Sequence, residues 1–403
     1  MDEFRIKSLH LKDTGPYLNF KLNFKDGPGL NIICGENGVG KTTILESIVS
    51  AFYQGRNHKI KRRQPAESGQ VTLDYRENHL SQKTVIQLKT FDPSQPEFIM
   101  SAHQYSRYIV NIGAHRDFAY HKQETIQRDP DFDIIRHSAQ LPNGINPNDI
   151  KSWFTNRYLL KHHANESSWT PQMHANLESA VSFFSLLDPK VKLDQVNVRT
   201  FDILVSTPSG TIPYEYMSSG FRSAYIMLLG ILRELEYRRL DVSAKEFSGV
   251  ILIDELDIHL HPSWQKEIGT ILKNAFPNAQ IIATTHSPHI IQAAQAEEVI
   301  ALSRNQDGVV EVRKLLSSKY GYAGWTVEEV LEDIMGVQDT RTSVFRDAML
   351  AFDKAIDARN AKEVRDSLTV LKEMLHPNNA LGKLLEIQAA PYMFDDLEGD
   401  DSD

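Results

Sequence analysis

Apolar and polar residues alternate along the first part of the chain with the two-residue period of β-strands. Segments Phe4–Leu11 and Leu18–Phe24 show this alternation, and the turn residues Asp13-Thr-Gly-Pro16 separate them. A strand with this pattern buries one face and exposes the other. Residues 71–75 and 84–88 repeat the pattern. The sequence therefore predicts two pairs of half-buried strands.

Four other segments are short, mainly apolar runs, as in strands that are buried on both faces. These segments cover residues 30–34, 108–112, 250–253 and 280–285. Apolar positions with helical spacing lie between them, most clearly at residues 43–52 and 224–235. Buried strands that alternate with helices predict an α/β fold.

One long insertion and one C-terminal region depart from this alternation. At about residues 120–190, a polar loop precedes two segments with helical spacing, so we expect a helical insertion there. After residue 305 the pattern is that of amphipathic helices only. We therefore expect an α/β domain at residues 1–305, a helical C-terminal region at 306–394 and a disordered acidic tail at 395–403.

Composition narrows the class of protein. The 403 residues include a single cysteine, Cys34, which excludes a disulfide framework. The sequence has neither a signal-like segment nor a run of 18 apolar residues, so we expect a cytoplasmic protein that does not contact membranes. The formal net charge is −9, so any DNA contact needs a local basic patch. The densest basic segment, Arg56–Arg63, suits either a solvated loop or such a contact.

The segment after the predicted strand at 30–34 has the pattern of a phosphate-binding loop. Gly35, Gly40, Lys41 and Thr42 fit GxxxxGK[ST], in which backbone N–H groups surround phosphates at a helix N-terminus. Lys41 would neutralise the β- and γ-phosphates, and the Thr42 hydroxyl would bind the Mg²⁺ that bridges them. The residues expected to bind ATP here are Asn37, Gly38, Val39, Gly40, Lys41, Thr42 and Thr43.

Two carboxylates follow the buried strand at 250–253. Asp254 and Glu255 come directly after four apolar residues. In this position Asp254 would hold Mg²⁺, and Glu255 would polarise the water that attacks the γ-phosphate. His286 follows the neighbouring strand at 280–285, where its side chain would reach the γ-phosphate. Arg116, after the strand at 108–112, suits either a phosphate or interface contact or a structural ion pair.

A second candidate anion site precedes the apolar helix at 224–235. Ser218, Ser219 and Gly220 form a short turn of the kind that caps a helix. Any helix start has this form, so the turn is informative only through its position between the phosphate-binding loop and Asp254.

The order of these motifs resembles the ABC-type ATPase heads of the SMC, RecF and OLD group. The resemblance covers residues 1–305 and implies a P-loop NTPase head with a mixed sheet. It also implies a homo-dimer or higher homo-oligomer in which nucleotide joins two heads. Ser218 and Gly220 would bind ATP held by the other protomer, and Asp257 would lie in the loop that crosses this interface. The group commonly has glycine and a polar residue where this chain has Ser219 and Phe221.

In this group the turn at Ser218-Ser219-Gly220 corresponds to the signature motif. The same resemblance implies a glutamine-bearing loop between the phosphate-binding loop and this signature turn. Gln104 is the candidate for this metal-side residue. OLD nucleases also carry a Toprim nuclease domain after the head, which needs strands that end in clustered acidic residues. The sequence has no such strand after residue 303, so we expect no intrinsic nuclease activity.

The C-terminal region resembles the PtuA family of ATPase subunits from Septu and retron-linked antiphage systems. The resemblance rests on Gly324-Trp-Thr-Val-Glu-Glu-Val-Leu-Glu-Asp-Ile-Met-Gly336. It implies a separate HNH nuclease partner, PtuB, which the helical region at 306–394 would bind. It also allows contact with DNA or a retron-type nucleic acid. Two alternatives stay open, a RecF-like DNA-maintenance ATPase without a nuclease partner and a standalone regulatory NTPase.

Overall fold

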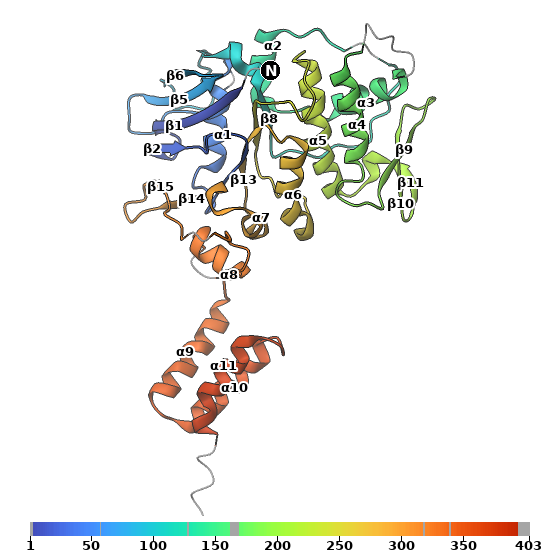
Figure 1. Ribbon diagram of the computed structural model, residues 1–403. Helices are drawn as coiled ribbons and strands as arrows, with labels where there is room; N and C mark the ends of the chain where they lie inside the picture. The colour runs from blue at the N-terminus through green and yellow to red at the C-terminus, as the bar shows by residue number, and fades with distance from the viewer. Residues whose placement is uncertain are drawn as a thin grey trace, which may run out of the picture. The chain divides into compact units, whose positions relative to one another are not determined.

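A computed structural model describes residues 3–56, 58–126, 129–161, 169–316, 319–337 and 340–393 (Figure 1). The chain forms two compact units, Met1–Gly336 and Val337–Asp403. The division lies at residue 336 and not at 305, where the sequence pattern places it. The reason is that residues 306–336 contribute both a strand and core side chains to the first unit.

The first unit is built on a six-stranded mixed sheet in the order β15-β14-β3-β13-β12-β8. Its strands are β3 (Gly29–Gly35), β8 (Ile109–Ile112), β12 (Val250–Ile253), β13 (Gln280–Thr284), β14 (Val299–Arg304) and β15 (Val310–Val312). Only the edge strand β15 is antiparallel to its neighbour. The predicted α/β fold with a mixed sheet is confirmed.

An antiparallel sheet, in the order β2-β1-β5-β6, contains the predicted hairpins. Its strands are β1 (Phe4–Thr14), β2 (Tyr17–Asn23), β5 (Gly69–Glu77) and β6 (Leu80–Leu88). One hydrophobic core joins side chains of this sheet, of helix α1 (Lys41–Ser50) and of one face of the central sheet. Helix α1 is thus held between two sheets (Figure 1). A short pair, β4 (Gln54–Gly55) and β7 (Ile99–Met100), follows it.

Helices cover the other face of the central sheet and share the largest core (Figure 1). They are α3 (Pro147–Leu160), α4 (Pro171–Phe183), α5 (Ser219–Tyr237), α6 (Pro262–Ala275) and α7 (Pro288–Ala293), with α2 (Ile134–Gln140) nearby. Helices α2 to α4 lie in the segment where the sequence predicts a helical insertion. Helix α5 buries most of its side chains, as its apolar sequence predicts. A small sheet of β9 (Lys192–Val196), β10 (Ile203–Thr207) and β11 (Gly210–Pro213) leads to α5.

The Gly324–Gly336 segment packs onto the first unit. Val330, Ile334 and Met335 are buried in its largest core. The Thr326 and Glu329 side chains form a capping box that starts α8 (Val327–Glu329), and a single π-helical turn continues to Ile334. The residues that carry the family resemblance therefore belong to the first unit.

The second unit is a bundle of three helices with its own core. Its helices are α9 (Ser343–Asp357), α10 (Ala361–Met374) and α11 (Ala380–Ala389). The buried side chains are Phe352, Ala355, Val364, Leu368, Leu371, Leu385 and Ala389. Asparagine and threonine side chains cap all three helices. The predicted acidic tail at 395–403 lies outside the described residues.

The small core of this bundle makes its stability depend on single side chains. Phe352 is completely buried in it, and Phe→Ala in a core costs about 3–5 kcal/mol. We expect Phe352→Ala to remove amide hydrogen-exchange protection from α9, α10 and α11 while the first unit keeps its protection. Val344→Ala, at a position 63% exposed on the same helix, is the matched control and should change little. Equal loss of protection in both units would show that they unfold together.

Candidate functional site

The phosphate-binding loop joins the end of β3 to the start of α1. Gly35, Gly38 and Gly40 have φ values of 140°, 74° and 105°, in the region that only glycine adopts freely. A Cβ at Gly40 would lie 2.6 Å from Cγ of Pro16 and 2.8 Å from Oη of Tyr17. These glycines allow the loop to curl back towards its own helix.

Other loop residues divide into a buried anchor and an exposed tip. Val39 is fully buried, whereas Asn37 and Gly38 are exposed. The Tyr17 hydroxyl donates to the Gly40 carbonyl oxygen over 2.9 Å, and burial raises the pKa of Tyr17 well above its usual value. Tyr17 therefore serves as a neutral brace behind the loop.

Lys41 lies inside the loop. Its Nζ donates to the carbonyl oxygens of Gly35 and Glu36, both at 2.9 Å. Burial lowers the pKa of Lys41, and the carboxylates of Asp254, Asp257 and Glu255 act in the opposite direction. The ammonium group is thus placed at the centre of the curl, where a phosphate would bind.

Thr42 and Asp254 meet at the start of α1. The Thr42 hydroxyl lies 3.1 and 3.2 Å from the two carboxylate oxygens of Asp254, and Thr284 donates to the same carboxylate over 2.7 Å. Beside them is a cavity of about 270 Å³, lined also by Glu46 and His115. Thr43 follows in the first turn of α1, where Gly15 packs against its methyl group.

This pair of oxygen donors suits Mg²⁺, which is usually held by one or two protein oxygens, water and substrate phosphates. Among the described residues, no cluster of three or more His, Cys, Asp or Glu side chains is arranged to hold a metal by itself. Thr42 and Asp254 would therefore bind Mg²⁺ together with a nucleotide.

Glu255 has an unusual backbone conformation, with φ of 50°. Such a conformation costs about 1–3 kcal/mol in a residue other than glycine and persists only where neighbours impose it. The Glu255 N–H donates to the Thr284 hydroxyl over 2.7 Å, and the Glu255 carbonyl oxygen accepts from Arg116. In the described part of the chain, the Glu255 carboxylate has no hydrogen-bond partner, so it is available to orient water.

Asp257 and His286 lie next to this turn. Oδ1 of Asp257 accepts from the Thr285 hydroxyl at 2.5 Å and from the backbone N–H of His286 at 2.9 Å. Burial lowers the pKa of His286, and the charge of Lys41 lowers it further, so its imidazole is neutral at pH 7. The sheet thus brings together six predicted residues, namely Lys41, Thr42, Asp254, Glu255, Asp257 and His286.

The signature turn lies at the start of α5, against the main chain at His259. Ser218 and Ser219 are exposed, and Gly220 is buried. A Cβ at Gly220 would lie 2.9 Å from both the His259 carbonyl oxygen and the Trp264 ring. No hydrogen bond in the described structure joins residues 218–220 to the phosphate-binding loop.

Gln104 is not brought to the site. It lies in a 3₁₀-helix, His103–Tyr108, that precedes the amino end of β8. There Ala102 N–H donates to the carbonyl of Ala51, which follows the last residue of α1, whereas Thr42 lies at the first turn. The ten residues of α1 rise about 15 Å, so Gln104 lies near the carboxyl end of this helix and far from Thr42 at its amino end. The residues that follow the carboxyl end of β8 begin at Gly113, and they include Arg116.

Arg116 is buried behind the Glu255 turn, where its contacts in the described residues are to main-chain carbonyl oxygens and a sulfur and not the ion pair that its sequence position suggested. It is 1% exposed, and its guanidinium donates to the carbonyl oxygens of Asp254, at 3.0 Å, and Glu255. Burial lowers the pKa of Arg116 to about 10, against the effect of the nearby carboxylates, so the group keeps its charge at neutral pH.

Three further residues support the site and have no individual signal in the sequence. Arg304 donates to the Gly38 carbonyl oxygen over 2.9 Å. A Cβ at Gly336 would lie 3.0 Å from Oε1 of Glu36. Thr284 holds both Asp254 and the Glu255 backbone, and only its place at the end of a buried strand could have pointed to it.

The basic segment at residues 56–63 is used largely for structure. Arg62 donates to the carbonyl oxygens of Lys89 and Ala66, and Arg63 donates to that of Pro16. Lys61 likewise reaches the carbonyl oxygen of Gln95. These bonds attach the segment to neighbouring loops. The exposed Lys59 is the exception, because its ammonium lies 3.9 Å from the Glu46 carboxylate and both side chains line the cavity beside Thr42.

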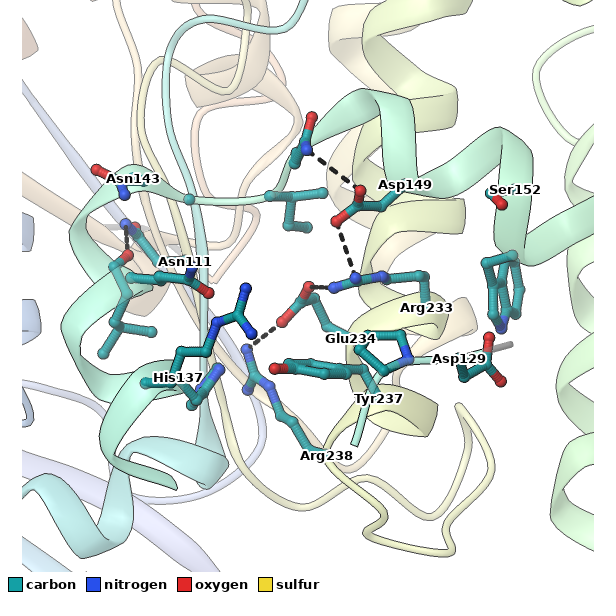
Figure 2. A pocket seen from close by; sticks show the side chains of 18 of the residues that line it. Asn111, Asp129, His137, Asn143, Asp149, Ser152, Arg233, Glu234, Tyr237 and Arg238 are labelled. Carbon is teal, nitrogen blue, oxygen red and sulfur yellow. Dashed lines mark hydrogen bonds and ion pairs between the residues drawn. The ribbon is translucent and has the colours of Figure 1, made fainter. Parts of the chain in front are cut away.

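A second, larger cavity of about 650 Å³ lies between α2, α3 and the end of α5 (Figure 2). Glu234 pairs there with Arg238 at 2.9 Å, and Arg233 pairs with Asp149 at 2.8 Å. Burial lowers the pKa of His137 to about 3, so this side chain is neutral. These charged groups are already paired with one another, and none of the predicted site residues lines the cavity.

Two family models match the chain. One describes an AAA domain, putative AbiEii toxin, type IV TA system, and matches residues 93–292. The other describes an AAA domain and matches residues 4–64, which include the phosphate-binding loop. No helix in the described ranges is long and apolar enough to cross a membrane.

Solved structures similar to the chain include an SMC head domain from Thermotoga maritima. It is 17% identical, with a TM-score of 0.45, and the match covers 77% of this chain and 99% of that one. A structure of the recombination mediator RecF is 15% identical, with a TM-score of 0.41, over 78% of this chain and 99% of that one.

Two curated relatives of this chain are both named Septu protein PtuA. A Septu protein PtuA from Bacillus mycoides is 25% identical over 96% of this chain, which spans 53% of that longer protein. A Septu protein PtuA from Bacillus thuringiensis is 38% identical, and the match covers 96% of this chain and 98% of the relative. Because this identity extends over nearly the full length of both proteins, the chain belongs to the Septu PtuA family.

Proposed function

We propose that the chain binds and hydrolyses ATP as a subunit of an antiphage defence complex. The observation that carries this proposal is the meeting of Thr42 and Asp254 beside Lys41, with the free Glu255 carboxylate next to them. A hydroxyl, a metal-side carboxylate, a phosphate-side ammonium and a water-orienting carboxylate are the parts that phosphoryl transfer to water requires. Membership of the PtuA family supports the place in defence.

Each of these residues has a distinct role in the proposed reaction. Backbone N–H groups of residues 37–43 and the Lys41 ammonium bind the phosphates. Thr42 and Asp254 hold Mg²⁺, which would neutralise the developing charge on the phosphate oxygens. Glu255 orients and polarises the attacking water, and the neutral His286 donates a hydrogen bond towards the γ-phosphate.

We infer that two copies of the chain share their nucleotide sites. The exposed Ser218 and Ser219 at the start of α5 leave N–H groups of the helix free to bind an anion from outside the chain. Ser218 and Gly220 then contact ATP held by the other copy, and Asp257 lies in the loop beside that interface. Nucleotide thereby stabilises a homo-dimer or a larger homo-oligomer.

We also propose that the three-helix unit binds a separate HNH nuclease, whose activity the ATPase controls. Apolar side chains on this unit support a docking role, since Val344, Leu384 and Ile387 are 63%, 57% and 69% exposed. The carboxylates Asp254 and Glu255 are committed to ATP. In the described residues, no other acidic cluster is arranged to hold metal, so DNA cleavage is assigned to the partner.

Removal of the Glu255 carboxylate tests the chemistry. Glu255→Gln should bind ATP with nearly unchanged affinity but hydrolyse it at least about 100-fold more slowly, because the phosphate and Mg²⁺ ligands remain. ATP-bound dimers should accumulate in size-exclusion chromatography. Lys41→Ala is the contrasting variant and should lose nucleotide affinity, measured by calorimetry. Hydrolysis at the wild-type rate by Glu255→Gln would place the base elsewhere.

Mixing two inactive variants tests the shared site. Ser218→Arg blocks the signature of one copy, and Lys41→Ala disables the phosphate-binding loop of the other. A mixed dimer then keeps one intact site out of two, so ATPase activity should reappear, with a maximum near equal amounts. Subunit exchange is verified separately with labelled protein. If the subunits exchange and no activity returns at any ratio, the sites are not shared.

Removal of the second unit tests partner docking. A chain that ends at Gly336 keeps the core residues Val330, Ile334 and Met335, so it should still bind ATP. It should fail to copurify with the proposed HNH nuclease partner when the two are coexpressed. The full-length double variant Leu384→Asp and Ile387→Asp should fail in the same way if the exposed apolar face carries the contact. Full copurification with the shortened chain would move the docking site to the ATPase unit.

A further inference from the structure

The strained turn at Glu255 is held from two sides. The Thr284 hydroxyl accepts the Glu255 N–H, and the Arg116 guanidinium donates to the carbonyl oxygens of Asp254 and Glu255. The second guanidinium nitrogen of Arg116 lies 3.0 Å from the sulfur of Met227 on α5, which fixes the group in place. Because φ of Glu255 is positive, loss of either contact lets the turn relax and moves the carboxylate.

The loop at residues 116–121 is also attached to α5, the helix that follows the signature turn and is called the signature helix below. Arg222, in the first turn of α5, forms a 2.9 Å ion pair with Asp117 and donates to the Phe118 carbonyl oxygen over 3.2 Å. Arg222 also donates to the Glu215 carbonyl oxygen, just before the signature, over 3.2 Å. One loop thus contacts both the Glu255 turn and the start of α5.

A buried ion pair fixes the far end of this loop. Lys151 of α3 donates to the His121 carbonyl oxygen over 2.7 Å, and its ammonium also binds Glu215 at 2.6 Å and Asp202 at 2.8 Å. The side chains of Lys151 and Glu215 are 3% and 1% exposed. The loop at residues 116–121 is therefore held at both ends against the signature segment.

We propose that Arg116 is a positioning residue for Glu255, and that its loop makes the placement of the Glu255 carboxylate depend on the placement of the signature helix. This inference rests on the proposed ATPase function and adds a residue that touches neither nucleotide nor metal. When the start of α5 is held by ATP from another copy, Arg222 and the loop transmit that position to the catalytic turn.

Arg238 supplies a matched control for Arg116. It is also 1% exposed, and it donates to a main-chain carbonyl, that of Ile109, at the amino end of the same strand, β8. It pairs with Glu234 beside the second cavity (Figure 2). Replacing either arginine with lysine disturbs a buried guanidinium and destabilises the fold. Only Arg116→Lys disturbs the Glu255 turn.

The experiment measures kcat and the Kd for ATP in Arg116→Lys and Arg238→Lys, each made with and without Glu255→Gln. Arg116→Lys should lower kcat about 10- to 100-fold with Kd changed less than about threefold, whereas Arg238→Lys should lower the melting temperature with little loss of kcat. In the Glu255→Gln background, Arg116→Lys should lower the residual rate less than about twofold, because both changes remove the same oriented water.

Two outcomes would overturn the proposal. One is an equal loss of kcat in the two arginine variants, and the other is the full effect of Arg116→Lys in the absence of the Glu255 carboxylate. If Glu255→Gln itself hydrolyses ATP normally, the proposed function fails instead, and the two failures are thereby distinguished.

If Arg116→Lys does not fold, Asp117→Asn tests the coupling between this loop and α5. The Asp117 side chain is 48% exposed, so this change leaves the core intact while it removes the charge that binds Arg222. We expect kcat to fall about three- to tenfold, with an unchanged Kd for ATP. The single variant Arg222→Lys keeps native Asp117 and a positive charge opposite it, so it should retain most of the wild-type rate. An unchanged kcat in Asp117→Asn would refute the coupling through the loop.

Discussion

The parallel pairing of β3, β13, β12 and β8 is the constraint on which the site depends. Ile33 of β3 pairs with Thr284, and Ile253 of β12 pairs with both Ala283 and Ile112. The residues that follow these strands therefore emerge at one edge of the sheet. A one-residue shift of β12 would reverse the faces of its side chains and remove Asp254 from the Thr42 hydroxyl.

A second constraint is the support that distant segments give to the phosphate-binding loop. Tyr17 fixes the Gly40 carbonyl, Arg304 fixes that of Gly38, and Lys41 crosses the inside of the curl. A loop of glycines gains little order from its own side chains, because glycine loses much conformational freedom on folding. These contacts pre-organise backbone N–H groups for phosphate, so less binding free energy is lost in ordering the loop.

Sequence patterns could predict residues that act through strand order, and could not predict those that act through tertiary contact. Asp254 and His286 follow buried apolar runs, so the direction of a parallel strand places them at the site. The resemblance implies a glutamine-bearing loop, and Gln104 matches it by residue type alone, but it precedes β8 and lies at the opposite edge of the sheet. The boundary at 305 was wrong because loss of α/β alternation does not reveal that Val330 and Met335 pack into the first core.

The end of the first unit lies beside the phosphate-binding loop. Gly336 is the last residue of the first unit, has φ of 79°, and packs against Glu36 of the phosphate-binding loop. Lys41 binds the Glu36 carbonyl from the other side. Gly336 and the Lys41 ammonium therefore both contact Glu36, so the end of the first unit bears on the same residue that Lys41 holds.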